Sequence, residues 1–165
     1  MREIIFKAKR KDNGEWVEGY YIYHIKRTIC PLGEDSVKPE DEQHVIMRDG
    51  FSDWNMPRNT VVYEINPDTL CQYTGLTDKN GKKIWENDIL RGYQYPYRSG
   101  GNDNYFAEVT WFENCQAFGI YTFKNPKSNV RGISEGNTEL MESLNSEDWE
   151  VIGNVFDNAD LLEVK

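Results

Sequence analysis

The feature that most constrains the fold of this chain is a two-residue alternation of apolar and polar side chains that stops at glycine-containing turns. Residues 105–112 show the alternation most clearly, since Tyr, Ala, Val and Trp take one face and Phe, Glu, Thr and Phe the other. The dipeptide Asn-Gly occurs at Asn13–Gly14 and at Asn80–Gly81. It readily takes two positive φ angles and so closes two-residue hairpins. Short strands folded back at such turns, with little helix, indicate an all-β protein.

Strands are expected at residues 3–9, 15–24, 44–47, 61–65, 89–93, 105–112, 117–123 and 149–156. Gly19 is expected to mark a bulge in the second of these strands. Helix is expected at 138–144, where Leu140, Met141 and Leu144 share one face. Single helical turns are expected after Asn66 and after Asn158. The long segments between strands are predicted to be loops.

Residues 51–60 follow neither the strand nor the helix period. They carry Phe51, Trp54 and Met56 among polar residues and a proline. We expect these three side chains to cover the core as a flap.

Composition narrows the function classes. The chain has 165 residues, with 5 Trp, 10 Tyr and 7 Phe, which suit half-buried sheet surfaces. Its formal net charge of −9 argues against broad attraction to nucleic acid or anionic lipid. No apolar run approaches the ~20 residues of a membrane span, and the N-terminus lacks the apolar region of a signal peptide. The odd number of cysteines, 3, far apart in sequence, predicts a reduced, cytoplasmic protein.

Three blocks of sequence carry a resemblance to a known family. The central block is YTGLTDKNGKKI at 73–84, followed by ENDI at 86–89. The outer blocks are FKA at 6–8 with WVEG at 16–19, and WEVIGNVFDN at 149–158. Together they resemble the YopX family of phage and prophage proteins. Asn87 stands where that family more often has glycine, which affects the turn there and not the fold.

The resemblance implies a phage-encoded origin and an SH3-like β-barrel with extra elements. It implies no assigned biochemical activity, so there are no catalytic residues to transfer. We therefore expect a barrel region at 67–165, with an N-terminal region at 1–66, built on a β-hairpin and loops, packed on it. We also expect one or two short helices in the chain.

Residues with the chemistry of a reactive site are scattered. His24, Cys30, His44, Cys71 and Cys115 lack the short paired spacing of a zinc site, so we predict no metal and no cofactor. A cysteine with a histidine as base remains an alternative that needs side-chain contact.

The corner after Trp85 offers a second alternative, because Glu86 and Asp88 could act as an acid–base pair. We favour a structural role in which Asp88 accepts backbone N–H groups, as aspartate commonly does in turns. Asn80 and Gly81 are likewise predicted to form a structural turn. No catalytic residue is predicted.

One segment combines aromatic and basic side chains in a pattern that suits a ligand. Its members are Arg91, Tyr93, Tyr95, Tyr97 and Arg98. They could pack within a strand, hold a peptide or protein as SH3-like grooves do, or stack the bases of single-stranded nucleic acid. Net charge disfavours nucleic acid.

These observations predict a non-enzymatic phage accessory protein in the cytoplasm of the bacterial host. It is expected to act by contact with a protein partner or with itself, as a homo-oligomer. The alternatives are a nucleic-acid-binding module using residues 91–98, an acidic surface that mimics DNA, and, with least support, an enzyme. No membrane contact is expected.

Overall fold

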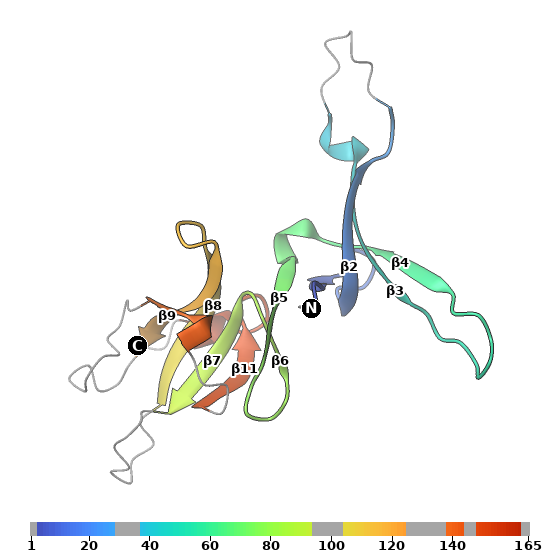
Figure 1. The fold of residues 1–165 in the computed structure, drawn as a ribbon. Coiled ribbons are helices and arrows are strands. Elements are labelled where there is room, and N and C mark those ends of the chain that lie inside the picture. Colours follow the sequence, from blue (N-terminus) through green and yellow to red (C-terminus); the bar gives the residue numbers. More distant parts are fainter. Residues whose placement is uncertain (1–2, 29–36, 94–103, 125–137, 144–147, 163–165) are drawn as a thin grey trace. The chain divides into compact units, whose positions relative to one another are not determined.

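The computed structural model describes residues 3–28, 37–93, 104–124, 138–143 and 148–162 (Figure 1). The chain forms two compact units, Met1–Gln72 and Tyr73–Lys165. Both are built from antiparallel strands, which confirms the all-β prediction. No helix among the described residues is long and apolar enough to cross a membrane.

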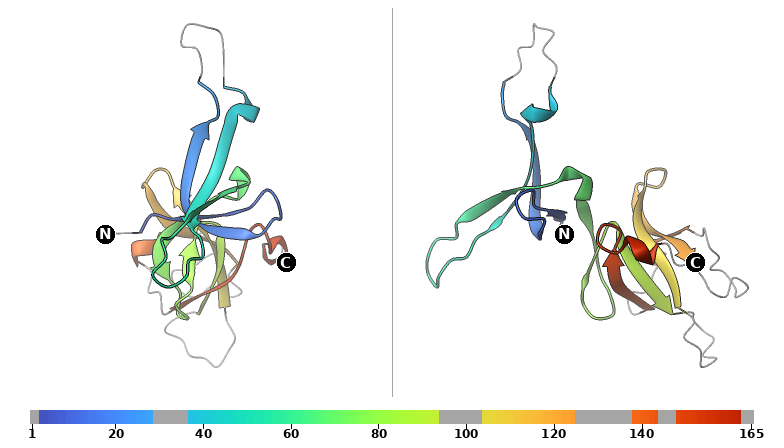
Figure 2. Two further views of the ribbon diagram at one scale, coloured as in Figure 1. Left: turned by 90° about the vertical axis from the view of Figure 1, so that its right-hand side faces the viewer. Right: turned by 180° about the vertical axis from the view of Figure 1, so that it is seen from behind.

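The first unit is a sheet in the order β4-β3-β2-β1-β5 (Figures 1 and 2). Its strands are β1 (Phe6–Lys9), β2 (Trp16–Ile25), β3 (Glu42–Asp49), β4 (Thr60–Glu64) and the start of β5 (Cys71–Thr77). Two 3₁₀ turns accompany them, η1 (Pro39–Asp41) and η2 (Pro67–Thr69). The second is the turn expected after Asn66, whose side chain accepts the N–H of Asp68 at 3.2 Å.

One face of this sheet forms the core of the first unit. Ala8, Val17, Ile46 and Ile65 are buried there. The register sets Ala8 opposite Val17, and Ile46 opposite both Tyr21 and Tyr63. Since side chains alternate between the two faces of a sheet, the neighbouring residues point the other way. The sheet therefore has a second face, carrying Tyr20, Met47 and Val62.

Gly19 does not mark the predicted bulge. It pairs with Phe6 in regular register. Its role is steric, because a Cβ atom built on Gly19 would lie 2.3 Å from the carbonyl oxygen of Met47. Only glycine lets β2 and β3 approach this closely.

The second unit contains a five-stranded sheet in the order β10-β9-β8-β7-β11, and β6 pairs with β5. The strands are β6 (Lys83–Trp85), β7 (Asp88–Tyr93), β8 (Asn104–Phe112), β9 (Ala117–Lys124), β10 (Thr138–Leu140) and β11 (Trp149–Asn154). The alternation in β8 is confirmed on its apolar side, because Ala107 and Val109 are fully buried in the core of this unit. Leu90, Ile120 and Trp149 are buried in the same cluster.

The predicted SH3-like barrel is not confirmed. Strands β10 and β11 lie at opposite ends of the sheet order, and no pairing between them closes a barrel among the described residues. Barrel closure and the packing of 1–66 against 67–165 remain predictions.

The helix predicted at 138–144 is wrong for its first half. Residues 138–140 form β10, with Glu139 opposite Ile120 and Leu140 opposite Gly119, and only Met141–Ser143 turn, as the 3₁₀ element η3. Three apolar residues are too few to favour helix over an open sheet edge. After Asn158 the chain does turn, as η5 (Ala159–Leu161), although the Asn158 side chain makes no capping hydrogen bond.

The turn at Asn80–Gly81 also differs from the expected two-residue loop. Gly81 N–H donates to the Asp78 carbonyl at 2.9 Å, and Asp78 N–H donates to the Lys82 carbonyl at 2.8 Å. Only Gly81 has positive φ, 79°. This is a three-residue loop, a turn followed by a residue in the left-handed region.

Asn87 occupies the position at which the resembled family more often has glycine. Its φ is 64°, in the left-handed region. Asparagine is among the non-glycine residues that tolerate this conformation best, so the substitution keeps the turn.

Candidate functional site

Asp78 fixes the turn of the β5–β6 hairpin to β11. Its side chain is 4% exposed. One carboxylate oxygen accepts the N–H groups of Asn80 at 2.8 Å and Lys82 at 2.9 Å, and the other accepts the N–H of Val151 at 3.0 Å. Burial raises the pKa of Asp78, but the hydrogen bonds from Val151, Lys82 and Asn80 outweigh it and hold the pKa below its usual value. This carboxylate is an ionised structural anchor.

An ion cluster lies beside this anchor. Glu150 accepts from Lys79 Nζ at 2.7 Å and from Arg91 at 2.8 Å. Arg91 and Glu150 are direct partners across β7 and β11. The hydrogen bonds from Lys79 and Arg91 lower the pKa of Glu150 from 4.5 to about 2. Arg91, predicted as a ligand contact, therefore has an ionic partner within its own sheet.

This cluster predicts an acid-sensitive contribution to stability. A carboxylate whose folded pKa is depressed stabilises the protein above its unfolded pKa and loses that contribution as pH falls. For Glu150 the loss should run from pH 4.5 down to about 2. Glu150→Gln should be less stable than the wild type at pH 7 and should lack this acid step. Urea unfolding midpoints across the pH range measure it.

The matched control is Glu113→Gln, because Glu113 is exposed in the turn after β8. It should keep the acid step of the wild type. An acid step that persists in Glu150→Gln would assign it to other carboxylates.

The rest of the aromatic and basic segment is described only in part. Tyr93 ends β7 opposite Asn104. Tyr95, Tyr97 and Arg98 lie outside the described residues, as does Cys30. A ligand role for this segment remains a prediction.

The corner carboxylate Asp88 faces the backbone. It is 2% exposed and accepts the N–H of Trp85 at 2.8 Å. This geometry matches the structural role that the sequence favoured over acid–base chemistry.

The described cysteines and histidines each have their own local surroundings. Cys71 is fully buried and its thiol donates to the Thr69 carbonyl at 3.4 Å, whereas Cys115 is exposed. His24 bonds Gln43, and His44 Nδ1 lies 2.7 Å from the Tyr21 hydroxyl. Within the described part of the chain, no three His, Cys, Asp or Glu side chains come together as a metal site.

The Tyr21–His44 pair joins a hydroxyl to an imidazole, the combination found in activated nucleophiles. Burial, with the nearby Tyr23 and Glu42, raises the pKa of Tyr21. A raised pKa keeps the phenol protonated at neutral pH, opposite to what an activated nucleophile requires. We interpret the contact between Tyr21 and His44 as a structural hydrogen bond within the β2–β3 hairpin.

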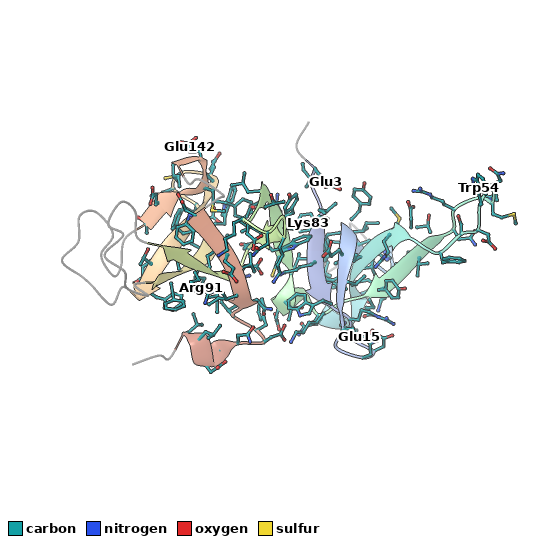
Figure 3. All side chains as sticks on the ribbon, turned by 90° about the horizontal axis from the view of Figure 1, so that it is seen from below. Glu3, Glu15, Trp54, Lys83, Arg91 and Glu142 are labelled. Atoms are coloured by element: carbon teal, nitrogen blue, oxygen red, sulfur yellow. The ribbon has the colours of Figure 1, made fainter. Side chains whose placement is uncertain are left out.

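Among the described residues, the large apolar side chains with the highest exposed fractions lie in the loop between β3 and β4. Phe51 is 90% exposed, Trp54 92% and Met56 63%, so the predicted flap over the core is wrong. Figure 3 shows Trp54 at the outer end of the β3–β4 hairpin. We call Phe51, Trp54 and Met56 the apolar tip.

Local contacts shape this loop without burying it. Asp49 and Arg58 form an ion pair at 2.9 Å across its base, and Met56 N–H donates to the Asp53 carbonyl at 3.1 Å. Asn55 takes a positive φ of 62°. The polar residues between the apolar ones were the sequence signal for exposure, since a buried flap would have to satisfy their hydrogen bonds.

The comparisons with known proteins place the chain in a family. No curated protein matches it. It is similar to the crystal structure of protein EF1440 from Enterococcus faecalis, with 23% identity, a TM-score of 0.46, and coverage of 99% of this chain and 100% of that one. The model of the YopX protein family matches residues 5–163. The resemblance seen in the three sequence blocks is therefore confirmed, and the chain belongs to the YopX protein family.

Proposed function

We propose that this chain is a phage- or prophage-encoded accessory protein that acts in the bacterial cytoplasm by binding another protein and catalyses no reaction. Membership of the YopX family supports the setting. The observation that carries the mode of action is the apolar tip. The SH3-like barrel expected for residues 67–165 belongs to the same proposal.

The apolar tip has the chemistry of a binding surface. Phe51 and Trp54 are almost fully solvent-exposed. Burying one such side chain against a partner contributes roughly 1.5–3 kcal/mol. Aromatic residues and methionine are also enriched at protein interfaces, and tryptophan is prominent among their hot spots. A side chain this exposed at the end of a hairpin contributes nothing to the core, and contact with a partner would bury its apolar surface.

The titratable groups support binding over catalysis. Asp78 and Asp88 are used by backbone N–H groups, and Tyr21 is held as a neutral phenol. The nucleic-acid alternative draws little support from Arg91, because its guanidinium is paired with Glu150 within the sheet.

The test compares proteins captured from a bacterial host lysate by the wild type and by the triple variant Phe51→Ala, Trp54→Ala, Met56→Ala. Loss of about 2 kcal/mol or more at a hot spot predicts at least about thirtyfold weaker binding of the wild-type partner. Tyr121→Ala is the matched control, since Tyr121 is 43% exposed in the other unit. Equal recovery of the same proteins by the triple variant would refute a role for the tip.

A further inference from the structure

Among the described residues, the outer edge of strand β4 is covered only at its C-terminal end, where Lys11 N–H donates to the Glu64 carbonyl and Arg10 bridges to Ile65. Strand β4 ends the order of the first sheet and has the sequence TVVYE. Natural proteins protect such edges with lysine, proline, bulges, short strands or a covering segment, because an open edge pairs with other chains. The five residues of β4 include no lysine, proline or bulge. Their one charge, Glu64, is at the end of the strand and is paired with Lys11 at 2.8 Å.

The other edges of the described sheets are protected. The outer edge of β11 is covered by the β5–β6 turn, since Val151 N–H donates to Asp78 and Lys79 N–H donates to the Trp149 carbonyl. Strands β6 and β10 have only 3 residues each. The contrast makes the open edge of β4 a feature that needs an explanation.

The ladder with β3 shows which groups this edge presents. Ile65 N–H donates to His44 at 3.0 Å and Gly50 N–H donates to Asn59 at 2.7 Å. Because bonding alternates along an antiparallel pair, the odd-numbered residues 59–65 bond to β3 and the even-numbered ones point outward. The Glu64 carbonyl on that outer side accepts the N–H of Lys11. Thr60 and Val62 present their N–H and C=O groups to a new strand.

The side chains around this edge form an apolar row on the outer face of the sheet. Val62 is 54% exposed and lies directly opposite Met47, which in turn lies opposite Tyr20, 56% exposed. Tyr20, Met47 and Val62 thus form an apolar row across the sheet, and Val62 is its last member at the β4 edge.

We propose that β4 pairs antiparallel with β4 of a second copy of this chain, about a two-fold axis at Val61. Thr60 of each copy then lies opposite Val62 of the other, and each pair exchanges both of its N–H···O bonds. The N–H and C=O groups of Thr60 and Val62 are the ones that point away from β3 and are available for this pairing. The proposal rests on the proposed function, in which the first unit acts by contact, and it names a second copy as one partner.

Charge favours a second copy at this edge. Two chains of net charge −9 repel each other, and residues 50–63 contain one acid, Asp53, and one base, Arg58. The proposed register also sets Glu64 of one copy opposite Arg58 of the other, and each of these two groups keeps an ionic partner within its own copy, Lys11 and Asp49. Contact here brings together the weakly charged parts of two acidic chains, which keeps their repulsion low.

The variant Val61→Glu tests the register. Within one copy it places a carboxylate opposite Arg48 of β3, which the fold tolerates. Across the axis it sets two carboxylates directly against each other. Sedimentation equilibrium should give the wild type twice the monomer mass of 19.3 kDa, and Val61→Glu should raise the dissociation constant at least about tenfold. Val61→Thr, β-branched and neutral, should stay close to the wild type.

Hydrogen exchange of the wild type gives a measurement that does not depend on a variant folding. The amides of Thr60 and Val62 should exchange more slowly as protein concentration rises, and amides of β10 should not change. Any one of three results would overturn the proposal. The wild type could be monomeric, the dissociation constant could be unchanged by Val61→Glu, or the exchange rates of the Thr60 and Val62 amides could be independent of protein concentration. A monomer that still loses its captured partner in the tip variant would leave the proposed function standing.

Discussion

Replacing Asp78 with alanine is expected to destabilise the second unit by about 3–5 kcal/mol. The change removes the acceptor of three backbone N–H groups, those of Asn80, Lys82 and Val151. Leaving a buried donor unsatisfied costs about 1–3 kcal/mol, and the loss of a charged acceptor shared by three donors therefore gives the expected total of about 3–5 kcal/mol. Chemical denaturation followed by tryptophan fluorescence measures the loss.

Two further variants isolate the cause. Asp78→Asn keeps an acceptor oxygen but sets an NH₂ group against backbone donors, so about 2 kcal/mol is expected. Asp160→Ala removes one exposed acid and should stay within about 0.5 kcal/mol of the wild type. The deficit of Asp78→Ala should also shrink as pH falls through the lowered pKa of Asp78, since protonation weakens the wild-type contact. An Asp78→Ala protein as stable as Asp160→Ala would show that the hairpin is fixed to β11 by other means.

Gly19→Ala is the second large effect, expected to cost about 3 kcal/mol in the first unit. The added Cβ would lie 2.3 Å from the Met47 carbonyl oxygen and 2.9 Å from Ile46 Cγ2. Overpacking typically costs 1–3 kcal/mol, and a backbone obstacle between two paired strands puts this site at the upper end. Urea denaturation followed by far-UV circular dichroism measures it.

Gly14→Ala separates crowding from backbone conformation. Gly14 has a φ of +74° and nothing within 4 Å of the added atom. Its substitution should cost about 1–2 kcal/mol, the penalty of the left-handed region alone. If Gly19→Ala lowers the free energy of unfolding by no more than Gly14→Ala does, then β2 and β3 can move apart at little energetic cost.

Local patterns in the sequence were enough for most of the strands, and the three motif blocks were enough for the family. Alternation over 105–112 places Ala107 and Val109 in the core, and the turn residues at Gly14 and Gly81 do take positive φ. These properties depend on neighbours a few residues away, which a sequence displays directly. The same reasoning reached the structural role of Asp88, because turn bonding is equally local.

The sequence says less about the candidate site, because exposure and distant partners decide what its members contact. Arg91 was chosen for its sequence neighbours, but its partner Glu150 is 59 residues away. Hydrophobicity alone predicts a buried position for the three side chains of the apolar tip. Whether such residues are buried depends on the direction in which the β3–β4 hairpin extends. The hydrophobicity of the residues does not specify that direction.

By itself, then, the sequence determined that this is a sheet protein, since side-chain period and turn chemistry are short-range properties, and its three motif blocks indicated the YopX family. The tertiary structure alone decided that Asp78 reaches Val151, 73 residues away, that 138–140 pair as a strand, and that β4 is left as an open edge. Hydrogen bonds between segments far apart in sequence form only once the chain has folded, and no local pattern specifies which strand will lack a neighbour.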